Sequence, residues 1–208
     1  MTAAQNPRRQ PRRSSIEVHR LLLEAAERVV SREGSRRATV TAIAAEAGVA
    51  VSRLYQHFDS REGLLEQAIQ APLTRFMERW RSALPDTRKP TDDLELMRLF
   101  VQTIYESAVE HRGLIQTLLV ELPGGSDAFT TRLMPMLSDA LEELEGIARE
   151  HARQQGIDES MIPAGLRATI TTTLTAAVLG PSYVQAASAE DLIDTIARIS
   201  AYGIRQAP

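Results

Sequence analysis

Side chains that can hydrogen-bond to DNA follow one another closely near residue 53. Val51, Ser52, Arg53, Gln56 and His57 would share the outer side of a short helix. An arginine can donate two hydrogen bonds to guanine, and a glutamine can pair with adenine. Arg53 is therefore the first candidate for reading a base. The alternative role of Arg53 is a phosphate contact or simple solvent exposure, because half or more of protein–DNA hydrogen bonds go to the DNA backbone.

A helix-turn-helix would position these residues. Thr39 can cap a short helix, in which Ala44 is small enough for a second helix to approach closely. Gly48 permits a turn with positive φ, and Leu54 and Phe58 would bury the inner side of the second helix. This order of helix, glycine turn and helix is the sequence form of a motif that places its second helix in the major groove.

Composition and charge narrow the class of protein. The 208 residues are 43% hydrophobic and 25% charged, which is typical of a folded chain. The absence of Cys excludes disulfides, thiolate metal ligands, a cysteine nucleophile and thiol redox sensing. Residues 1–65 hold eleven Arg and seven Asp or Glu, a net charge of +4, whereas residues 66–208 hold thirteen Lys or Arg and twenty acids, a net charge of −7. This asymmetry indicates a basic end that meets a polyanion.

Three regions follow from these patterns. Residues 1–15 are expected to be a disordered basic arm, residues 16–62 a DNA-binding domain, and residues 63–208 a helical domain. No apolar stretch suited to a secretory signal follows the arginines of the arm, so we expect a cytoplasmic protein. The arm could enter a flanking minor groove or follow phosphates, and a solvated tail is the alternative. Its arginines are Arg8, Arg9, Arg12 and Arg13.

The stretch from about residue 22 to residue 65 resembles the tetracycline-repressor-type (TetR) transcriptional regulators. The residues that carry the resemblance are Ala25-Ala26, Gly34, Ala38-Thr39-Val40, Ile43-Ala44, Ala47-Gly48-Val49, Leu54-Tyr55, His57-Phe58, Ser60-Arg61-Glu62 and Leu64-Leu65. The resemblance covers about the first third of the chain. It implies an all-α fold of about nine helices, in which an N-terminal three-helix DNA-binding domain precedes a domain for ligand binding and dimerisation.

The resemblance also implies a function and the residues that serve it. A homodimer would bind a palindromic operator in double-stranded DNA, usually as a repressor that a small-molecule effector releases. Thr39, Tyr55, His57 and Arg61 would hold phosphates, and Thr41, Val51, Ser52, Arg53 and Gln56 would contact base edges or nearby backbone.

Three departures from the family pattern limit what can be carried over. Ala50 stands where a hydroxyl usually caps the recognition helix, and losing a cap costs about 1 kcal/mol. Val51 and Arg53 differ from the commoner pattern, so the operator sequence cannot be inferred. Gly63 stands where a Glu often completes a capping box after Ser60.

The remaining chain has a helical period throughout. We expect helices over about 92–112, 127–155 and 190–205, a kink or interruption at Pro72, and a break at Gly113. Pro135 is an expected irregularity. The segment 168–189 has no charged residue, but five threonines and Gly180-Pro181 argue against a membrane span and for a buried helix.

An effector cavity and a subunit interface are expected in this second domain. Mostly apolar candidates favour a hydrophobic or amphipathic effector, although core packing is the alternative role for each. The cavity candidates are Phe76, Trp80, Phe100, Thr103, Ile104, Ser107, Leu118, Met134 and Leu137. The interface candidates, on the last two helices, are Thr173, Ala177, Tyr183, Ile196 and Ile199.

Two other functions remain open. A sequence-independent DNA-coating protein could use the same helices, and its signature would be equal affinity for all sequences with a steep salt dependence. A helical enzyme is the second alternative, but the four histidines are isolated and no HExxH, P-loop, GxGxxG or GxSxG pattern occurs. We therefore predict no catalytic residues, no metal ligands and no cofactor.

Overall fold

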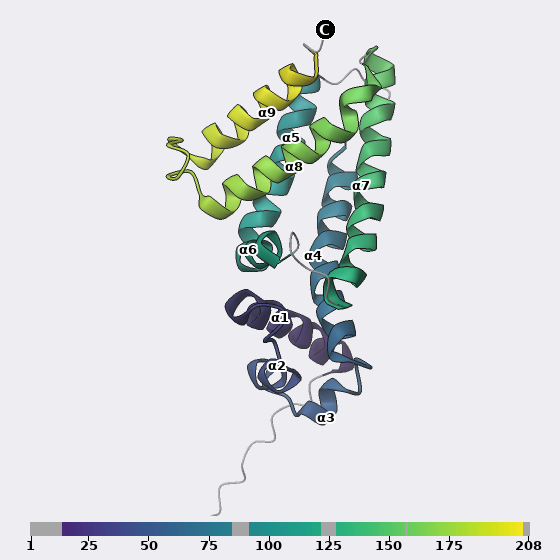
Figure 1. Ribbon diagram of the computed structural model, residues 1–208, viewed down its shortest axis with the longest axis vertical. Helices are drawn as coiled ribbons and strands as arrows, with labels where there is room; N and C mark the ends of the chain where they lie inside the picture. The colour runs from purple at the N-terminus through teal and green to yellow at the C-terminus, as the bar shows by residue number, and fades with distance from the viewer. Residues whose placement is uncertain (1–13, 85–91, 122–127, 157, 206–208) are drawn as a thin grey trace, which may run out of the picture.

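The computed structural model describes residues 14–84, 92–121, 128–156 and 158–205. These residues form nine α-helices and a short 3-10 helix, and they contain no strand, as the helical periodicity predicts (Figure 1). The first three helices lie at one end of the molecule, and α8 and α9 lie at the other. The arginines expected in the basic arm, Arg8, Arg9, Arg12 and Arg13, lie outside the described residues.

The N-terminal domain contains α1 (Ser15–Glu33), α2 (Val40–Ala47) and α3 (Val51–Leu54). Helix α1 begins slightly before its expected start, because the Ser14 side chain accepts a hydrogen bond from the Glu17 amide at 3.1 Å and caps it. Leu22, Ile43 and Leu54, one from each helix, are fully buried together. This shared core holds α2 and α3 against α1.

Helix α4 (Arg61–Ala83) connects the two domains. Ser60 caps it by accepting a hydrogen bond from the Gly63 amide at 3.0 Å. The helix runs through Pro72, so the interruption expected there is wrong, whereas a kink at this position stays a prediction. Pro72 is buried, and α4 packs along its length against α1, α5 and α7, so tertiary contacts offset the lost backbone hydrogen bond.

The C-terminal domain consists of five further α-helices. They are α5 (Asp93–Glu110), α6 (Arg112–Glu121), α7 (Ala128–Gln155), α8 (Ile162–Leu179) and α9 (Ala189–Arg205), and η2 (Glu159–Met161) precedes α8. Helices α5, α8 and α9 share one apolar core, and α4, α5, α7 and α8 share another. Helix α7 continues through Pro135.

The expected break at Gly113 is wrong, because Gly113 lies inside α6. The chain instead turns at His111, between α5 and α6. A Cβ atom on Gly113 would lie 2.6 Å from the Cβ of Ser31 on α1. The glycine therefore serves the close approach of α6 to α1 rather than the end of a helix.

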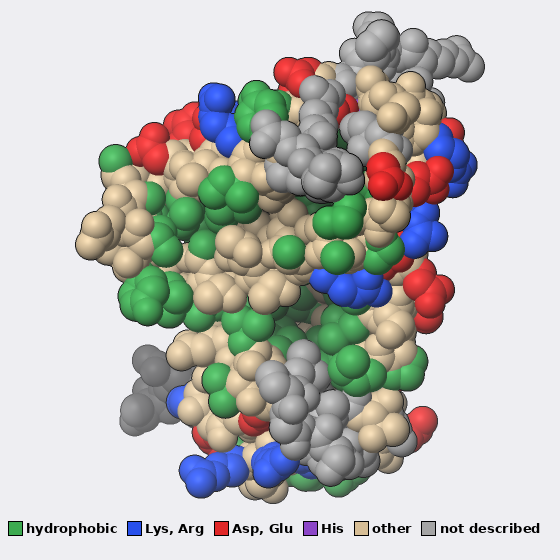
Figure 2. Space-filling view, turned by 45° about the horizontal axis from the view of Figure 1, so that its top comes forward, with side chains coloured by type: hydrophobic (Ala, Val, Ile, Leu, Met, Phe, Trp, Pro, Cys, Tyr) green, Lys and Arg blue, Asp and Glu red, His purple; other side chains and the backbone are tan. Residues whose placement is uncertain are grey.

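The exposed face of the C-terminal domain carries few charges over its middle. In the view of Figure 2, hydrophobic and uncharged side chains form a band across it, and charged side chains lie along its upper and right-hand edges. Within the described residues, one helical stretch, Glu159–Leu179, is long and apolar enough to cross a membrane by length and composition, with a mean hydropathy of 1.2. One third of that stretch is buried against the rest of the protein.

Candidate functional site

The polar side chains around α2 and α3 face solvent at one end of the molecule. Thr41, Ser52, Tyr55 and Gln56 are exposed. Val51, Arg53 and His57 are partly exposed beside them. The structure thus brings these predicted contact residues onto one small domain, and their roles toward DNA remain predictions.

Two backbone features position α2 and α3. Thr39 accepts a hydrogen bond from the Ala42 amide at 3.1 Å and caps α2. Gly48 has φ 65° and ψ 40°, the left-handed conformation that ends α2 and turns the chain into α3. Ala50 occupies the cap position of α3 and makes no side-chain cap hydrogen bond. Helix α3 has only four residues, so Tyr55 and His57 lie in the turns that follow it rather than in a longer helix.

Arg61, the first residue of α4, contacts the segment between α1 and α2. Its Nε donates to the carbonyl oxygen of Ala38 at 2.6 Å, and its Nη2 donates to that of Ser35. The guanidinium also pairs with Glu62 at 3.2 Å. Arg61 therefore holds the segment between α1 and α2 in place, whether or not it also contacts a phosphate.

Two histidine rings lie close together, one from α1 and one from the turn that follows α3. The ring centroids of His19 and His57 are 5.9 Å apart, and His19 stacks on Phe58 with a centroid distance of 4.7 Å. Partial burial, and secondarily the proximity of His57, lowers the pKa of His19. The lowered pKa favours the uncharged form of the His19 ring, which packs against Phe58 next to His57.

Polar contacts join α1 and the residues after it to α6 and the turn before it. Nδ1 of buried His111 lies 2.5 Å from Oε1 of Glu27. The Ser35 amide donates to Oε1 of Glu121 at 3.1 Å. Leu114 and Leu118 of α6 complete the apolar core of the N-terminal domain. A shift of α6 would therefore be transmitted to α1.

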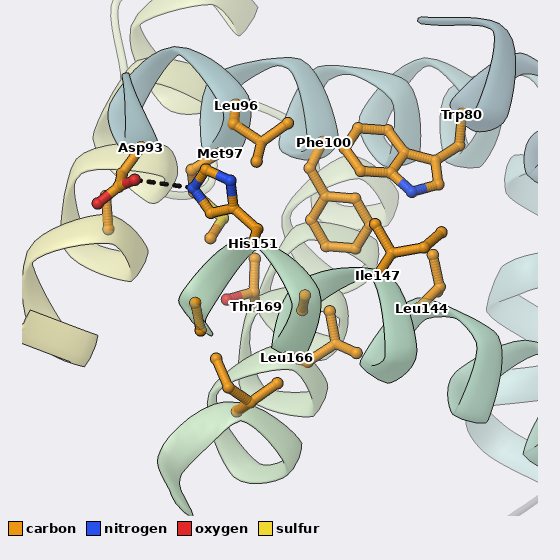
Figure 3. Close-up of a pocket in the computed structure, with 14 residues that line it drawn as sticks. Trp80, Asp93, Leu96, Met97, Phe100, Leu144, Ile147, His151, Leu166 and Thr169 are labelled. Carbon is orange, nitrogen blue, oxygen red and sulfur yellow. Dashed lines mark hydrogen bonds and ion pairs between the residues drawn. The ribbon is translucent and has the colours of Figure 1, made fainter. Parts of the chain in front are cut away.

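A cavity of about 110 Å³ lies at the far end of α4 (Figure 3). The Trp80 and Phe100 rings meet edge to face in its wall, with centroids 4.9 Å apart. Nε2 of His151 lies 2.8 Å from Oδ1 of Asp93 at the opposite side of the cavity. The lining residues are Trp80, Asp93, Leu96, Met97, Phe100, Leu144, Ile147, Ala148, His151, Ala152, Ile162, Leu166, Thr169 and Ala201.

The predicted cavity residues are placed in several different environments. Trp80 and Phe100 line the cavity, and Phe76 and Ile104 pack in the apolar cluster behind them. The Thr103 hydroxyl donates to the Leu99 carbonyl at 2.8 Å, and Ser107 is partly buried on the same helix. Leu118 and Leu137 pack on the N-terminal core, and Met134 is 48% exposed.

The predicted interface residues divide into two groups. Thr173, Ala177 and Ile196 are buried inside the protomer. Tyr183 and Ile199 are each 69% exposed. Ile199, which the periodicity of the last helix placed beside Ile196, points away from the protomer core.

Sequence reasoning missed the polar pair in the cavity, Asp93 and His151. Asp93 lies in the first turn of α5, where an acidic residue is common for helix stability alone. His151 is isolated in sequence, and its partner is 58 residues away. The available signal was a histidine near the end of a long amphipathic helix, which does not by itself specify a cavity.

Comparisons with known proteins agree with this geometry. The family model described as bacterial regulatory proteins, tetR family, matches residues 22–68. The chain is similar to the nucleoid occlusion factor SlmA of Photobacterium profundum, with 26% identity over 159 residues that cover 74% of this chain and 80% of that protein.

Two solved structures extend the likeness across the chain. The fatty acid degradation regulator FadR of Bacillus halodurans superimposes with a TM-score of 0.74 at 19% identity, covering 89% of this chain and 98% of that one. The transcriptional regulator FadR of Bacillus subtilis, solved in complex with stearoyl-CoA, gives a TM-score of 0.72 at 19% identity, with the same coverage. At these identities the two structures show a common fold.

Proposed function

We propose that this chain, whose residues 22–68 match the model of the tetR family of bacterial regulatory proteins, is a cytoplasmic transcriptional repressor controlled by a small molecule. In this proposal a homodimer binds a palindromic operator and releases it when an apolar or amphipathic effector occupies the cavity. The observation that carries the proposal is α4, which joins the exposed DNA-binding domain to the apolar cavity. The reported relatives are named as regulators or as a nucleoid factor, and we propose no catalytic activity.

Helix α4 supplies a physical route between the two sites. Arg61 in its first turn holds carbonyl groups of the N-terminal domain, and Trp80 near its other end lines the cavity. At 1.5 Å per residue, the two are about 28 Å apart along the helix axis. An effector that moves Trp80 would therefore tilt the support of α2 and α3, and it would change operator affinity by its differential affinity for the two arrangements.

The character of the cavity favours an apolar effector. Most of its lining residues are aliphatic or aromatic. The solved Bacillus subtilis relative is a complex with stearoyl-CoA, which makes an acyl chain one candidate for this chain as well. Burial of such a chain would supply most of the binding free energy.

An exposed apolar region supports the homodimer. Large hydrophobic side chains lie at the end of α8, in the following loop and on the outer side of α9, and they are Leu179, Tyr183, Val184, Ile199 and Tyr202. On α8 itself, Ala168, Thr171, Thr172 and Thr175 are exposed and so are available to a second copy. Such patches on a folded protein mark interaction sites.

Selection of fragmented genomic DNA on the purified protein, at near-physiological salt, tests the proposal. We expect enrichment of a palindrome, and the combined substitution R53A and Y55F should lower affinity for that palindrome by about 100-fold. Arg112→Ala, at an exposed position on α6, is the matched control and should leave operator binding unchanged. Flat recovery of all fragments would contradict the specific operator.

The likeness to a nucleoid occlusion factor favours a second candidate, a protein that binds DNA without regulating a particular gene. In that case the chain would retain many genomic fragments with similar affinity, and the dependence on salt would be steep. The same selection separates the two candidates, because only the repressor would enrich a palindrome. Adding an apolar ligand is a second test, because only the repressor would then release its DNA.

A further inference from the structure

At one end of the apolar cavity lies a polar group that can form a further hydrogen bond. The Thr169 hydroxyl is already bonded to the Gly165 carbonyl and the Ser200 hydroxyl, each at 2.9 Å. His151 and Asp93 remain as the polar part of the lining, paired through Nε2 and Oδ1 at 2.8 Å. Both side chains are largely buried, with exposed fractions of 22% and 11%.

The pairing determines what the other nitrogen of His151 can accept. A carboxylate can only accept hydrogen bonds, so the Nε2 that faces Asp93 carries a proton. In an uncharged imidazole the second nitrogen, Nδ1, then holds a lone pair. No described residue bonds to this Nδ1. In Figure 3 it lies on the ring edge that faces Phe100 rather than Asp93.

This arrangement selects among the polar groups that an apolar ligand can bring. A hydroxyl can donate to Nδ1, whereas an ether or an ester brings only acceptors and would leave the lone pair unpaired. A carboxylate would also place a second negative charge beside Asp93 in a poorly hydrated cavity.

We propose that the effector is an uncharged, mainly apolar molecule whose hydroxyl group donates a hydrogen bond to Nδ1 of His151. The proposal rests on the proposed function of the cavity as the effector site and specifies the chemical class that it accepts. Asp93 is then a positioning residue, since it orients the imidazole and disfavours anionic ligands.

Three probes of nearly equal size test this class. They are decanol, its isomer methyl nonyl ether, and decanoate, titrated at pH 8, where decanoate is ionised. Trp80 is the only tryptophan of the chain and lines the cavity, so its fluorescence reports binding directly. We expect decanol to bind about tenfold more tightly than the ether, and decanoate to bind more weakly than both.

Two substitutions assign the preference to the polar pair. His151→Phe keeps a ring of similar shape but removes both nitrogens, so decanol should lose its advantage while the ether binds within about threefold of the wild-type affinity. Asp93→Asn removes the negative charge, so decanoate should gain at least about fivefold relative to decanol. The ether is the internal control for an intact cavity in both variants.

The outcomes separate this proposal from the proposed function. Equal binding of decanol and ether to the wild type, or tightest binding of decanoate, would overturn the hydroxyl class while leaving an apolar effector cavity. If none of the probes binds, both the class and the apolar effector are overturned. Operator binding, measured on the same preparation, tests the repressor independently of either result.

Discussion

The two ends of α4 lie in opposite chemical environments. At the first end, Arg61 makes directional hydrogen bonds to the carbonyl groups of Ser35 and Ala38. At the other end, Trp80 packs against Phe100 and aliphatic side chains around a cavity. Directional contacts hold one arrangement, whereas apolar contacts tolerate repacking. The contrast indicates that the N-terminal end of α4 is held rigidly and that the end beside the cavity is the part that adapts.

Removing the directional contacts should have the largest effect on stability. Arg61→Ala leaves two carbonyl groups without their charged donor, and we expect it to lower the free energy of unfolding by about 2 kcal/mol. Operator binding should weaken as well, because the segment before α2 loses its support. Thermal denaturation and operator titration measure the two effects. Arg61→Lys is the matched variant and should restore only part of the stability, since a single ammonium cannot span both carbonyls. Unchanged stability of the alanine variant would contradict the rigidity of the N-terminal end of α4.

The contact between α1 and α6 is a second place where rigidity can be tested. Gly113→Ala would place a Cβ 2.6 Å from that of Ser31, and we expect a net loss of about 1 kcal/mol despite the better helix propensity of alanine. Gly146→Ala, on α7, meets nothing within 4 Å and should gain up to about 1 kcal/mol. Denaturant unfolding of both variants compares them directly. Equal changes in the free energy of unfolding of the two variants would show that the packing of α6 on α1 has room for a Cβ atom at position 113.

Filling the cavity should weaken ligand binding there without weakening operator binding. Ala148→Leu adds three carbons to the lining, and we expect the free energy of unfolding to change by less than about 1 kcal/mol, because the cavity has room for them. Decanol affinity should fall at least about tenfold, while operator affinity is retained. Fluorescence of Trp80 and an operator titration provide the two measurements. An equal loss of operator affinity would contradict the adaptability of the cavity end of α4, because the change would then have been transmitted to the N-terminal end.

The smallest expected effect concerns an exposed ion pair in each domain. Hydrogen bonds from Arg28 first, and then from Arg32, lower the pKa of Glu46, and a hydrogen bond from Arg81 lowers the pKa of Glu143. A lowered carboxyl pKa means that each pair contributes stability above about pH 4.5 and that this contribution is lost as the pH falls further. Glu46→Gln and Glu143→Gln should each lower the melting temperature slightly at pH 7 and lower it less at pH 3. An equal loss at both pH values would assign the effect to packing rather than charge.

The same contrast explains how much of the molecule the sequence could predict. The caps at Thr39 and Ser60 and the turn at Gly48 are local, so their residue types identify them directly. The cavity depends on how α4, α5, α7 and α8 pack together, and an apolar residue in any of them fits a core equally well. Trp80 and Phe100 were therefore found together with residues that belong to other cores, such as Leu118.

The break expected at Gly113 and the interruption expected at Pro72 are wrong for a related reason. Both residues have strong local preferences for ending helices, yet both lie inside helices that other helices cover. In Gly113 the missing side chain serves a contact with Ser31, which lies 82 residues earlier in the chain and leaves no local trace. Tertiary packing thus overrides local propensity where two domains meet.

The short, uncapped α3 has a consequence for the kinetics and heat of DNA binding. Four residues and no side-chain cap leave its backbone amides with little protection, so local opening there costs less free energy than in α1 or α4. Amide hydrogen exchange should therefore be fastest in this segment of the free N-terminal domain. Ordering of the segment on the operator would carry an unfavourable entropy and a more favourable enthalpy, so affinity would decrease on warming more steeply than for a fully formed recognition helix.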